Sequence, residues 1–111
     1  MSIYKVGKAD KNGYINVFEG IKRKTLVYGD KTLLTEFILS KDKILPAHKH
    51  PEEQTGYLVS GHIMLTIEGE VHDMEPGDSW SIPGDAEHGA EIREDSVALE
   101  VFSPVREDYI V

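Results

Sequence analysis

Short apolar segments alternate with turn residues along the whole chain, and this pattern predicts strands rather than helices. Many of the segments alternate apolar and polar positions, as expected for strands with one buried face. The predicted strands are residues 15–18, 23–28, 33–39, 44–50, 55–60, 63–67, 71–74, 78–82, 88–92 and 97–102. Many short strands at this spacing indicate an antiparallel sandwich or barrel, because no connection has the roughly dozen residues of a crossover helix.

Glycine, proline and aspartate separate the predicted strands. Turns are expected at residues 29–30, 60–61, 68–70, 75–78 and 83–85. Residues 63–74 are expected to form a hairpin around Gly69, since glycine adopts a positive φ at low cost. The length of 111 residues fits a single all-β domain over residues 1–111. The tail, residues 103–111, is expected to cover a barrel mouth or to reach a partner.

Composition narrows the possible partners. The chain has 12 Lys and Arg against 20 Asp and Glu, a formal net charge of −8, which argues against binding nucleic acid or anionic membranes. An anionic ligand would therefore need a local positive site. The absence of cysteine excludes disulfides and thiolate metal sites. With neither a signal-peptide pattern nor an apolar run of about 18 residues, we expect a soluble cytoplasmic protein.

Three histidines and one amide have the spacing of a metal site. His48 and His50 are two residues apart on one predicted strand, so both side chains point to the same face. Gln54 begins the next strand beside His50, and His88 can arrive from across the barrel after the turn at residues 83–85. These ligands suit a divalent transition metal ion (Zn, Ni, Mn or Fe) and leave room for water or substrate.

A lone His-x-His pair is more often a surface strand without metal, so the joint spacing with Gly61, Gly77 and Pro83 carries the prediction. His62 and His72 have no partner at a useful spacing and are expected at the strand surface or the edge of the core.

The spacing of these residues resembles the two motifs of the cupin superfamily. The first motif is His-x-His with Glu or Gln four residues on and Gly seven further, and the second is Gly-x5-Pro-x4-His. The resemblance covers about residues 33–106 and implies a double-stranded β-helix (jelly-roll) barrel with the metal inside one end, often in a homodimer. Two positions depart from the usual pattern. Gln54 stands where a carboxylate is common, and Asp85 stands where glycine is usual.

A second segment lies near the C-terminus. Glu100 falls in an apolar run, where a carboxylate is costly unless paired, although a solvent-facing position on an alternating strand is equally compatible with the pattern. Glu100-x-Phe102-x-Pro104-x-Arg106 resembles the acidic-x-Phe-x-Pro-x-Arg tail of small single-domain cupins of pectin and alginate degradation, the KdgF type. Those proteins also carry Gln in the first motif. Their acidic residue is typically Asp, one methylene shorter than Glu100.

The KdgF-type resemblance implies ring opening of a 4,5-unsaturated monouronate, an isomerase-like activity. It implies metal binding by His48, His50, Gln54 and His88, and further functional roles for Glu100, Phe102 and Arg106. Glu100 is expected to act as a general base and Arg106 to bind the carboxylate of a small anionic sugar. Phe102 would line the sugar pocket. Trp80 is expected either to line the barrel or to anchor the core.

Two other functions stay open at this point. Many cupins are metal-dependent oxygenases, although the neutral Gln54 favours Lewis-acid chemistry over redox cycling. A non-catalytic cupin that binds a small molecule is the third possibility. Substrate retention without turnover, unaffected by Glu100→Gln, would indicate such a binding module.

Overall fold

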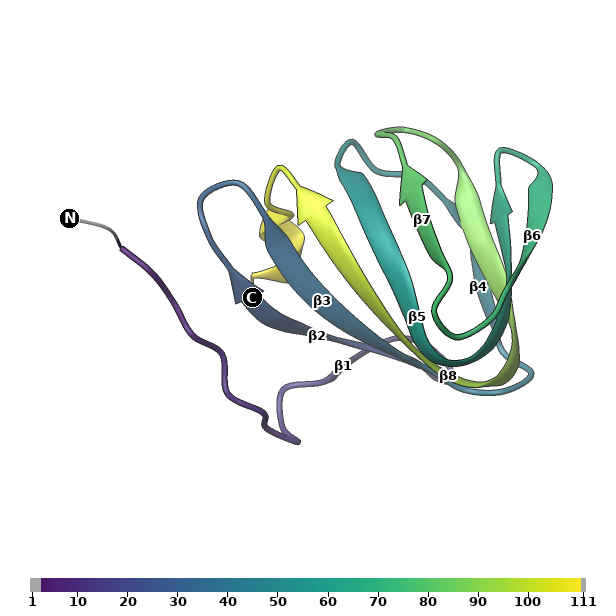
Figure 1. Ribbon diagram of the computed structural model, residues 1–111, viewed down its shortest axis with the longest axis horizontal. Helices are drawn as coiled ribbons and strands as arrows, with labels where there is room; N and C mark the ends of the chain where they lie inside the picture. Colours follow the sequence, from purple (N-terminus) through teal and green to yellow (C-terminus); the bar gives the residue numbers. More distant parts are fainter. Residues whose placement is uncertain (1–2, 111) are drawn as a thin grey trace.

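The computed structural model describes residues 3–110, and its regular structure is almost entirely β-strand (Figure 1). The strands are β1 (Ile15–Phe18), β2 (Ile21–Tyr28), β3 (Leu33–Leu39), β4 (Ile44–His48), β5 (Glu53–Ile67), β6 (Glu70–Met74), β7 (Ser79–Ile82) and β8 (His88–Ser103). A short 3₁₀ turn, η1 (Glu107–Tyr109), follows. The predicted all-β class is confirmed. Within residues 3–110 there is no helix with the length and apolar character needed to cross a membrane.

Two long strands connect the two halves of the barrel. The C-terminal half of β8 pairs with β3 and with the first half of β5, which in turn pairs with β7. The N-terminal half of β8 pairs with β4 and with the second half of β5, which pairs with β6. Every pairing is antiparallel, and the single eight-stranded sheet curves around a common interior (Figure 1). This arrangement is the predicted jelly roll.

The predicted boundary inside β5 is wrong. Residues 55–60 and 63–67 belong to one strand, as do residues 88–92 and 97–102 in β8. The strand bends at Ser60-Gly61 through register shifts instead of reversing in a turn. Gly61 has a φ of 93°, and a Cβ there would lie 2.0 Å from the Ser96 hydroxyl. That hydroxyl accepts the His62 N–H at 3.0 Å, so β5 and β8 bend together.

Other predicted boundaries hold to within a few residues. Ile67 pairs with Glu70, so the turn of the β5–β6 hairpin consists of Glu68 and Gly69, both at positive φ, as primed two-residue turns require. The strand predicted over residues 44–50 ends at His48. Asp85 has a φ of 66°, which explains why the cupin pattern usually places glycine there; aspartate tolerates this conformation better than most residues.

Side chains that point inward from both halves of the curved sheet form the core. The larger apolar cluster includes Leu58, Ile82 and Ile92, each no more than 2 % exposed. A second cluster of Leu33, Phe102 and Tyr109 lies where the C-terminal turn packs against the sheet. The tail therefore folds back onto the barrel, and Tyr109 closes one side of its interior.

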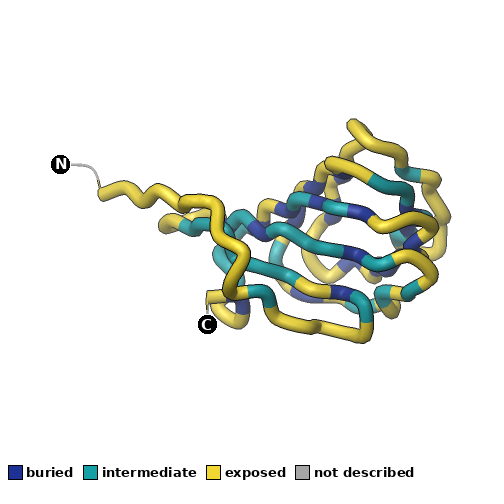
Figure 2. Tube along the Cα trace, turned by 90° about the horizontal axis from the view of Figure 1, so that it is seen from below, coloured by how far each residue is buried: buried dark blue, intermediate teal, exposed yellow. Residues whose placement is uncertain are grey.

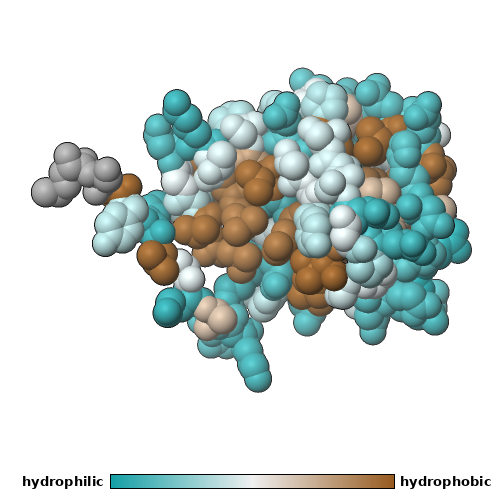
Figure 3. Space-filling model, in the orientation of Figure 1, coloured by the Kyte–Doolittle hydropathy of each residue, from teal (hydrophilic) through white to brown (hydrophobic). Residues whose placement is uncertain are grey.

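Residues 3–10 form an extended arm that leaves the barrel (Figure 2). Ile3, Tyr4 and Val6 on this arm are 94 %, 82 % and 72 % exposed. The outer surface of the sheet also carries apolar side chains, as Figure 3 shows over β3 and β8. Leu34 and Val101 pair across these two strands on that outer side.

Candidate metal centre and its cavity

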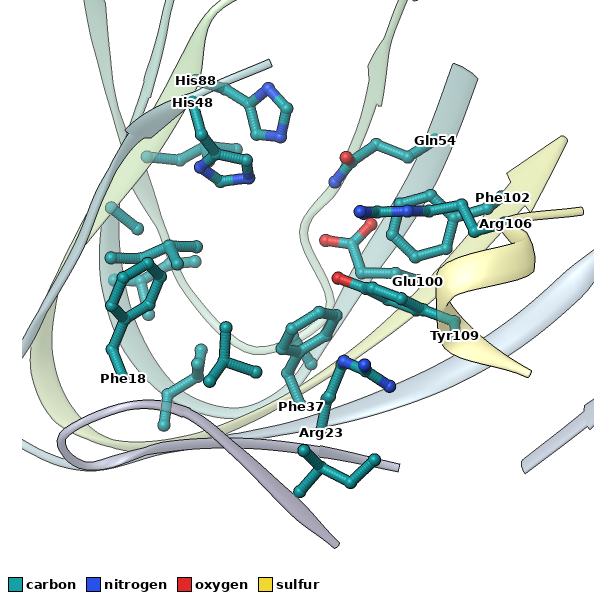
Figure 4. A pocket seen from close by; sticks show the side chains of 18 of the residues that line it. Phe18, Arg23, Phe37, His48, Gln54, His88, Glu100, Phe102, Arg106 and Tyr109 are labelled. Atoms are coloured by element: carbon teal, nitrogen blue, oxygen red, sulfur yellow. The ribbon is translucent and has the colours of Figure 1, made fainter. Parts of the chain in front are cut away.

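Three histidines meet at one end of the barrel. His48 ends β4 and pairs directly with His88 at the start of β8, while His50 follows β4 by two residues. One ring nitrogen from each histidine lies within 4.8 Å of the others. Figure 4 shows the His48 and His88 rings side by side at the cavity. The structure thus brings together three side chains that are up to 40 positions apart in the sequence.

Backbone carbonyls fix the orientation of all three rings. Nδ1 of His48 lies 2.8 Å from the Pro46 carbonyl, Nδ1 of His50 lies 3.0 Å from that of Glu52, and Nδ1 of His88 lies 2.8 Å from that of Ala86. A carbonyl only accepts hydrogen bonds, so each Nδ1 carries the proton and each Nε2 keeps its lone pair. This is how proteins commonly orient imidazoles that bind a metal through Nε2.

The environment also keeps two of the histidines neutral. Burial lowers the pKa of His88 to about 4, and the charges of neighbouring histidines and Arg106 act in the same direction. Burial, followed by the charge of Arg106, likewise lowers the pKa of His50. A neutral imidazole is the form that binds metal, so these ligands need not lose a proton near pH 7.

The fourth predicted ligand, Gln54, lies beside His50. Its amide oxygen is 2.7 Å from Nε2 of His50. Because the proton of His50 is on Nδ1, its Nε2 and the amide oxygen of Gln54 are both hydrogen-bond acceptors. A cation between them would interact favourably with both. Three imidazole nitrogens and one amide oxygen suit a divalent transition metal, so the residues fit the ion that the sequence predicts.

A cavity of about 350 Å³ opens beside the histidines. All of the candidate site residues except His50 line it (Figure 4); they are His48, Gln54, His88, Glu100, Phe102 and Arg106. The His50 ring packs edge-on against the rings of His88 and Phe102, with centroid distances of 5.1 and 5.5 Å. The opposite wall is largely apolar and includes Phe18 and Phe37.

Glu100 is a buried carboxyl group at the centre of this cavity wall. It pairs with Gly56 on β5, which pairs on its other side with Trp80 on β7. A Cβ on Gly56 would lie 2.1 Å from the Trp80 indole nitrogen and 2.5 Å from a Glu100 oxygen. The glycine therefore leaves the space in which Trp80 donates hydrogen bonds to both Glu100 oxygens, at 2.9 and 3.3 Å.

Burial is the main influence on the Glu100 carboxyl. It raises the pKa of Glu100 to about 8, although hydrogen bonds from Trp80 and Gln54 act in the opposite direction. A carboxyl group with a pKa in this region can both accept and donate a proton near neutral pH. Trp80 has both roles expected from the sequence, since it is buried and also lines the cavity.

Arg106 lies at the edge of the cavity and is paired within the protein. Its Nη2 and Nε donate to the two carboxylate oxygens of Asp108, at 2.8 and 3.3 Å. Its Nε also lies 3.8 Å from a carboxylate oxygen of Glu52. Phe102 packs edge-on against both the His50 ring, at 5.5 Å, and the Tyr109 ring, at 5.3 Å.

Sequence reasoning missed Arg23, Tyr109 and Asp108 at this site. Arg23 is on β2, where four of the first five residues are polar or charged and no alternation shows which ones point inward. Asp108 has a local signal, because its spacing from Arg106 permits a short-range pair. The two histidines that were not predicted as ligands lie elsewhere: His62 contacts Asp73, and the His72 side chain is 46 % exposed.

Comparison with known proteins places this geometry in a family. The sequence model of the Cupin_2 family, described as the cupin domain, matches residues 35–104. The pectin degradation protein KdgF of Dickeya dadantii is 30 % identical over 103 residues, which covers 91 % of this chain and 94 % of that protein. The solved structure of KdgF from Halomonas sp. superposes with a TM-score of 0.88 at 28 % identity, covering 96 % of this chain and 98 % of the other.

A more local similarity involves a different class of protein. An acireductone dioxygenase of Bacillus anthracis is 34 % identical over 62 residues. The match covers 50 % of this chain and 36 % of the dioxygenase. The similarity to the KdgF proteins, by contrast, extends over nearly the whole length of both partners.

Proposed function

The chain belongs to the Cupin_2 family, and from this premise we propose that it is a metal-dependent enzyme that opens the ring of a small acidic sugar, such as a 4,5-unsaturated monouronate. One observation carries the proposal: a buried carboxyl group, Glu100, lines the same cavity as the histidine cluster. Similarity to KdgF proteins along nearly the whole chain supports the choice of substrate class.

The metal would be held by His48, His50, Gln54 and His88. When bound, a divalent ion supplies Lewis-acid chemistry, since it lowers the pKa of a nearby hydroxyl group and stabilises developing negative charge. The preset Nε2 lone pairs and the amide oxygen of Gln54 support this assignment.

Glu100 is the proposed general base. Ring opening of a cyclic hemiacetal removes the proton of the anomeric hydroxyl and turns C1 into an aldehyde. The bond between C1 and the ring oxygen breaks, and the ring oxygen keeps the electron pair as an enolate. Protonation of that enolate at C4 gives the ketone and removes the C4–C5 double bond. A carboxyl group whose pKa lies near neutral pH suits both proton transfers.

Arg106 and Phe102 would shape the binding of the sugar. Arg106 is the cation whose charge reaches His50 and His88, and it is the proposed partner of the substrate carboxylate near the metal. Because Arg106 is already paired with Asp108, the substrate carboxylate would have to compete with the Asp108 carboxylate. Phe102 is 1 % exposed and holds its position between two rings, so it would form a rigid wall.

A metal-dependent oxygenase is the second candidate. The local similarity to acireductone dioxygenase supports it, as do the three histidines. Oxygen uptake by the iron-loaded protein, with a uronate or another small acid present, would support the oxygenase. We favour ring opening because Gln54 contributes no negative charge to offset a higher oxidation state of the metal.

A homodimer is part of the proposal. The exposed arm with Ile3, Tyr4 and Val6, together with the apolar outer side of β3 and β8, is surface that a second copy would cover. Sedimentation of the protein tests this, and a monomer at micromolar concentration would contradict it.

The test of the function uses a lyase-generated 4,5-unsaturated galacturonate and follows its ultraviolet absorbance. We expect the protein to accelerate the loss of absorbance, a chelator to stop it, and added metal to restore it. If the metal-loaded protein leaves the loss of ultraviolet absorbance at the rate of the buffer control, the proposal is contradicted.

A further inference from the structure

A second guanidinium, that of Arg23, lies at the same cavity as Arg106. Arg23 on β2 pairs with Phe37 on β3, and both side chains line the cavity. Its guanidinium carbon is 3.8 Å from the centroid of the Tyr109 ring, and that of Arg106 is 3.9 Å from the same centroid. Two planar groups this close to one ring centre must lie on its opposite faces, as Figure 4 shows.

The two guanidiniums differ in what they are paired with. Arg106 binds both carboxylate oxygens of Asp108 and also lies near Glu52. Among residues 3–110, no carboxylate side chain forms an ion pair with Arg23. The one hydrogen bond that its side chain forms with these residues is a long one, 3.4 Å, to the backbone oxygen of Asp108. Arg23 therefore keeps most of its capacity to bind an anion, whereas Arg106 does not.

The two arginines also lie at different depths in the site. Figure 4 shows Arg106 between Gln54 and Tyr109, on the side of the histidines, whereas Arg23 lies beyond Tyr109, beside Phe37. An anionic ligand whose reacting end lies at the histidines would thus have a cation at its other end. In a protein with a net charge of −8, such a cation supplies the local positive site that an anionic ligand needs.

We infer that Arg23 is a specificity-determining residue that binds the single carboxylate of an anionic sugar together with Arg106. Arg23 supplies direct hydrogen bonds from the face of Tyr109 opposite to Arg106, while Arg106, held by Asp108, contributes its positive charge. The inference rests on the proposed function for its substrate class. A guanidinium binds a carboxylate through two parallel charge-assisted hydrogen bonds, which Arg23 can offer without displacing a resident carboxylate. Tyr109 holds the guanidinium plane in place by stacking.

The alternative is that Arg23 only anchors the C-terminal turn. Thr25, two residues along the same strand, also ties this turn to β2, because its hydroxyl donates to the backbone oxygen of Tyr109. Thr25→Val removes that bond without changing charge, so it serves as the structural control. Lys22→Met is the charge control, since Lys22 is exposed on the neighbouring position of β2.

Binding is measured through Trp80, the only tryptophan of the chain, which lines the cavity. The probes are D-galacturonate and D-galactose, which differ at the carboxylate, titrated against the metal-loaded protein. We expect wild type to prefer galacturonate, and Arg23→Met to weaken galacturonate binding by about 10- to 100-fold with little effect on galactose, as the loss of charged hydrogen bonds predicts. Arg23→Lys should keep part of the preference, and both controls should keep all of it.

Several results would overturn the inference: an unchanged preference in Arg23→Met, no preference in wild type, or equal losses for both sugars. Because the readout is binding, it remains decisive even if the wild-type protein opens no uronate ring. Absence of turnover would remove the proposed function alone.

Discussion

Replacement of Glu100 by glutamine should change how stability depends on pH. In the metal-free protein, burial raises the pKa of Glu100 from its ordinary value of 4.5 to about 8. Between these two values the folded protein holds a proton that the unfolded chain has released. Folding stability contributed by this group is therefore lost as pH rises through that window. Glutamine keeps the shape and an acceptor for Trp80 but has no proton to lose.

The magnitude follows from the pKa difference. Linkage gives a slope approaching 1.4 kcal/mol per pH unit inside the window, so wild type should lose about 2 to 3 kcal/mol relative to Glu100→Gln between pH 5 and pH 7. The pKa of His88, lowered to about 4, acts in the opposite direction at lower pH. That contribution is common to both proteins and cancels in the difference.

Urea unfolding with a chelator present, at several pH values, measures the difference directly. The quantity compared is the difference in unfolding free energy between wild type and Glu100→Gln. If this difference changes by less than about 0.5 kcal/mol between pH 5 and pH 7, Glu100 does not have a raised pKa. Repeating the series with bound metal adds a second check. A cation near the carboxylate favours its charged form, so the pH dependence should become smaller.

Three further predictions concern the site. His50→Ala should abolish stoichiometric metal binding while His72→Ala keeps it, as metal analysis of the purified proteins will show; full occupancy in His50→Ala would remove the proposed site. Arg106→Ala should raise KM for the unsaturated uronate more than for its neutral methyl ester, and equal increases would exclude a role in binding the carboxylate. Gly56→Ala should cost about 1 to 3 kcal/mol in urea unfolding, because its Cβ would overlap Trp80 and Glu100. Gly29→Ala, with open space around it, is the matched control and should be near neutral; equal losses in both would contradict the packing argument.

The sequence predicted the fold well because strand alternation and turn residues are local signals. The hairpin at Glu68-Gly69 and the strand over residues 33–39 are examples, since neighbouring residues alone specify them. The continuity of β5 was not predictable in this way. Ser60-Gly61 reads as a turn, and only its pairing with β8 makes it a bend within one strand.

The sequence predicted those residues of the candidate site that belong to the two cupin motifs or to the C-terminal tail motif. His48, His50, Gln54 and His88 converge as expected, and Glu100 and Phe102 face the same cavity. Arg23 and Tyr109 come together through long-range packing of β2 against the C-terminal turn, which leaves no local pattern. The pairing of Arg106 with Asp108 likewise depends on how the turn folds back.

The most direct test of metal-dependent ring opening is a nuclear magnetic resonance spectrum of the reaction product. Metal-loaded wild-type protein is incubated with the 4,5-unsaturated uronate, beside His50→Ala and a buffer control. We expect the signals of the cyclic unsaturated sugar to be replaced by those of the open-chain keto acid faster with wild type than with either control. Signals that decay at the buffer rate, although the metal is bound, would contradict it.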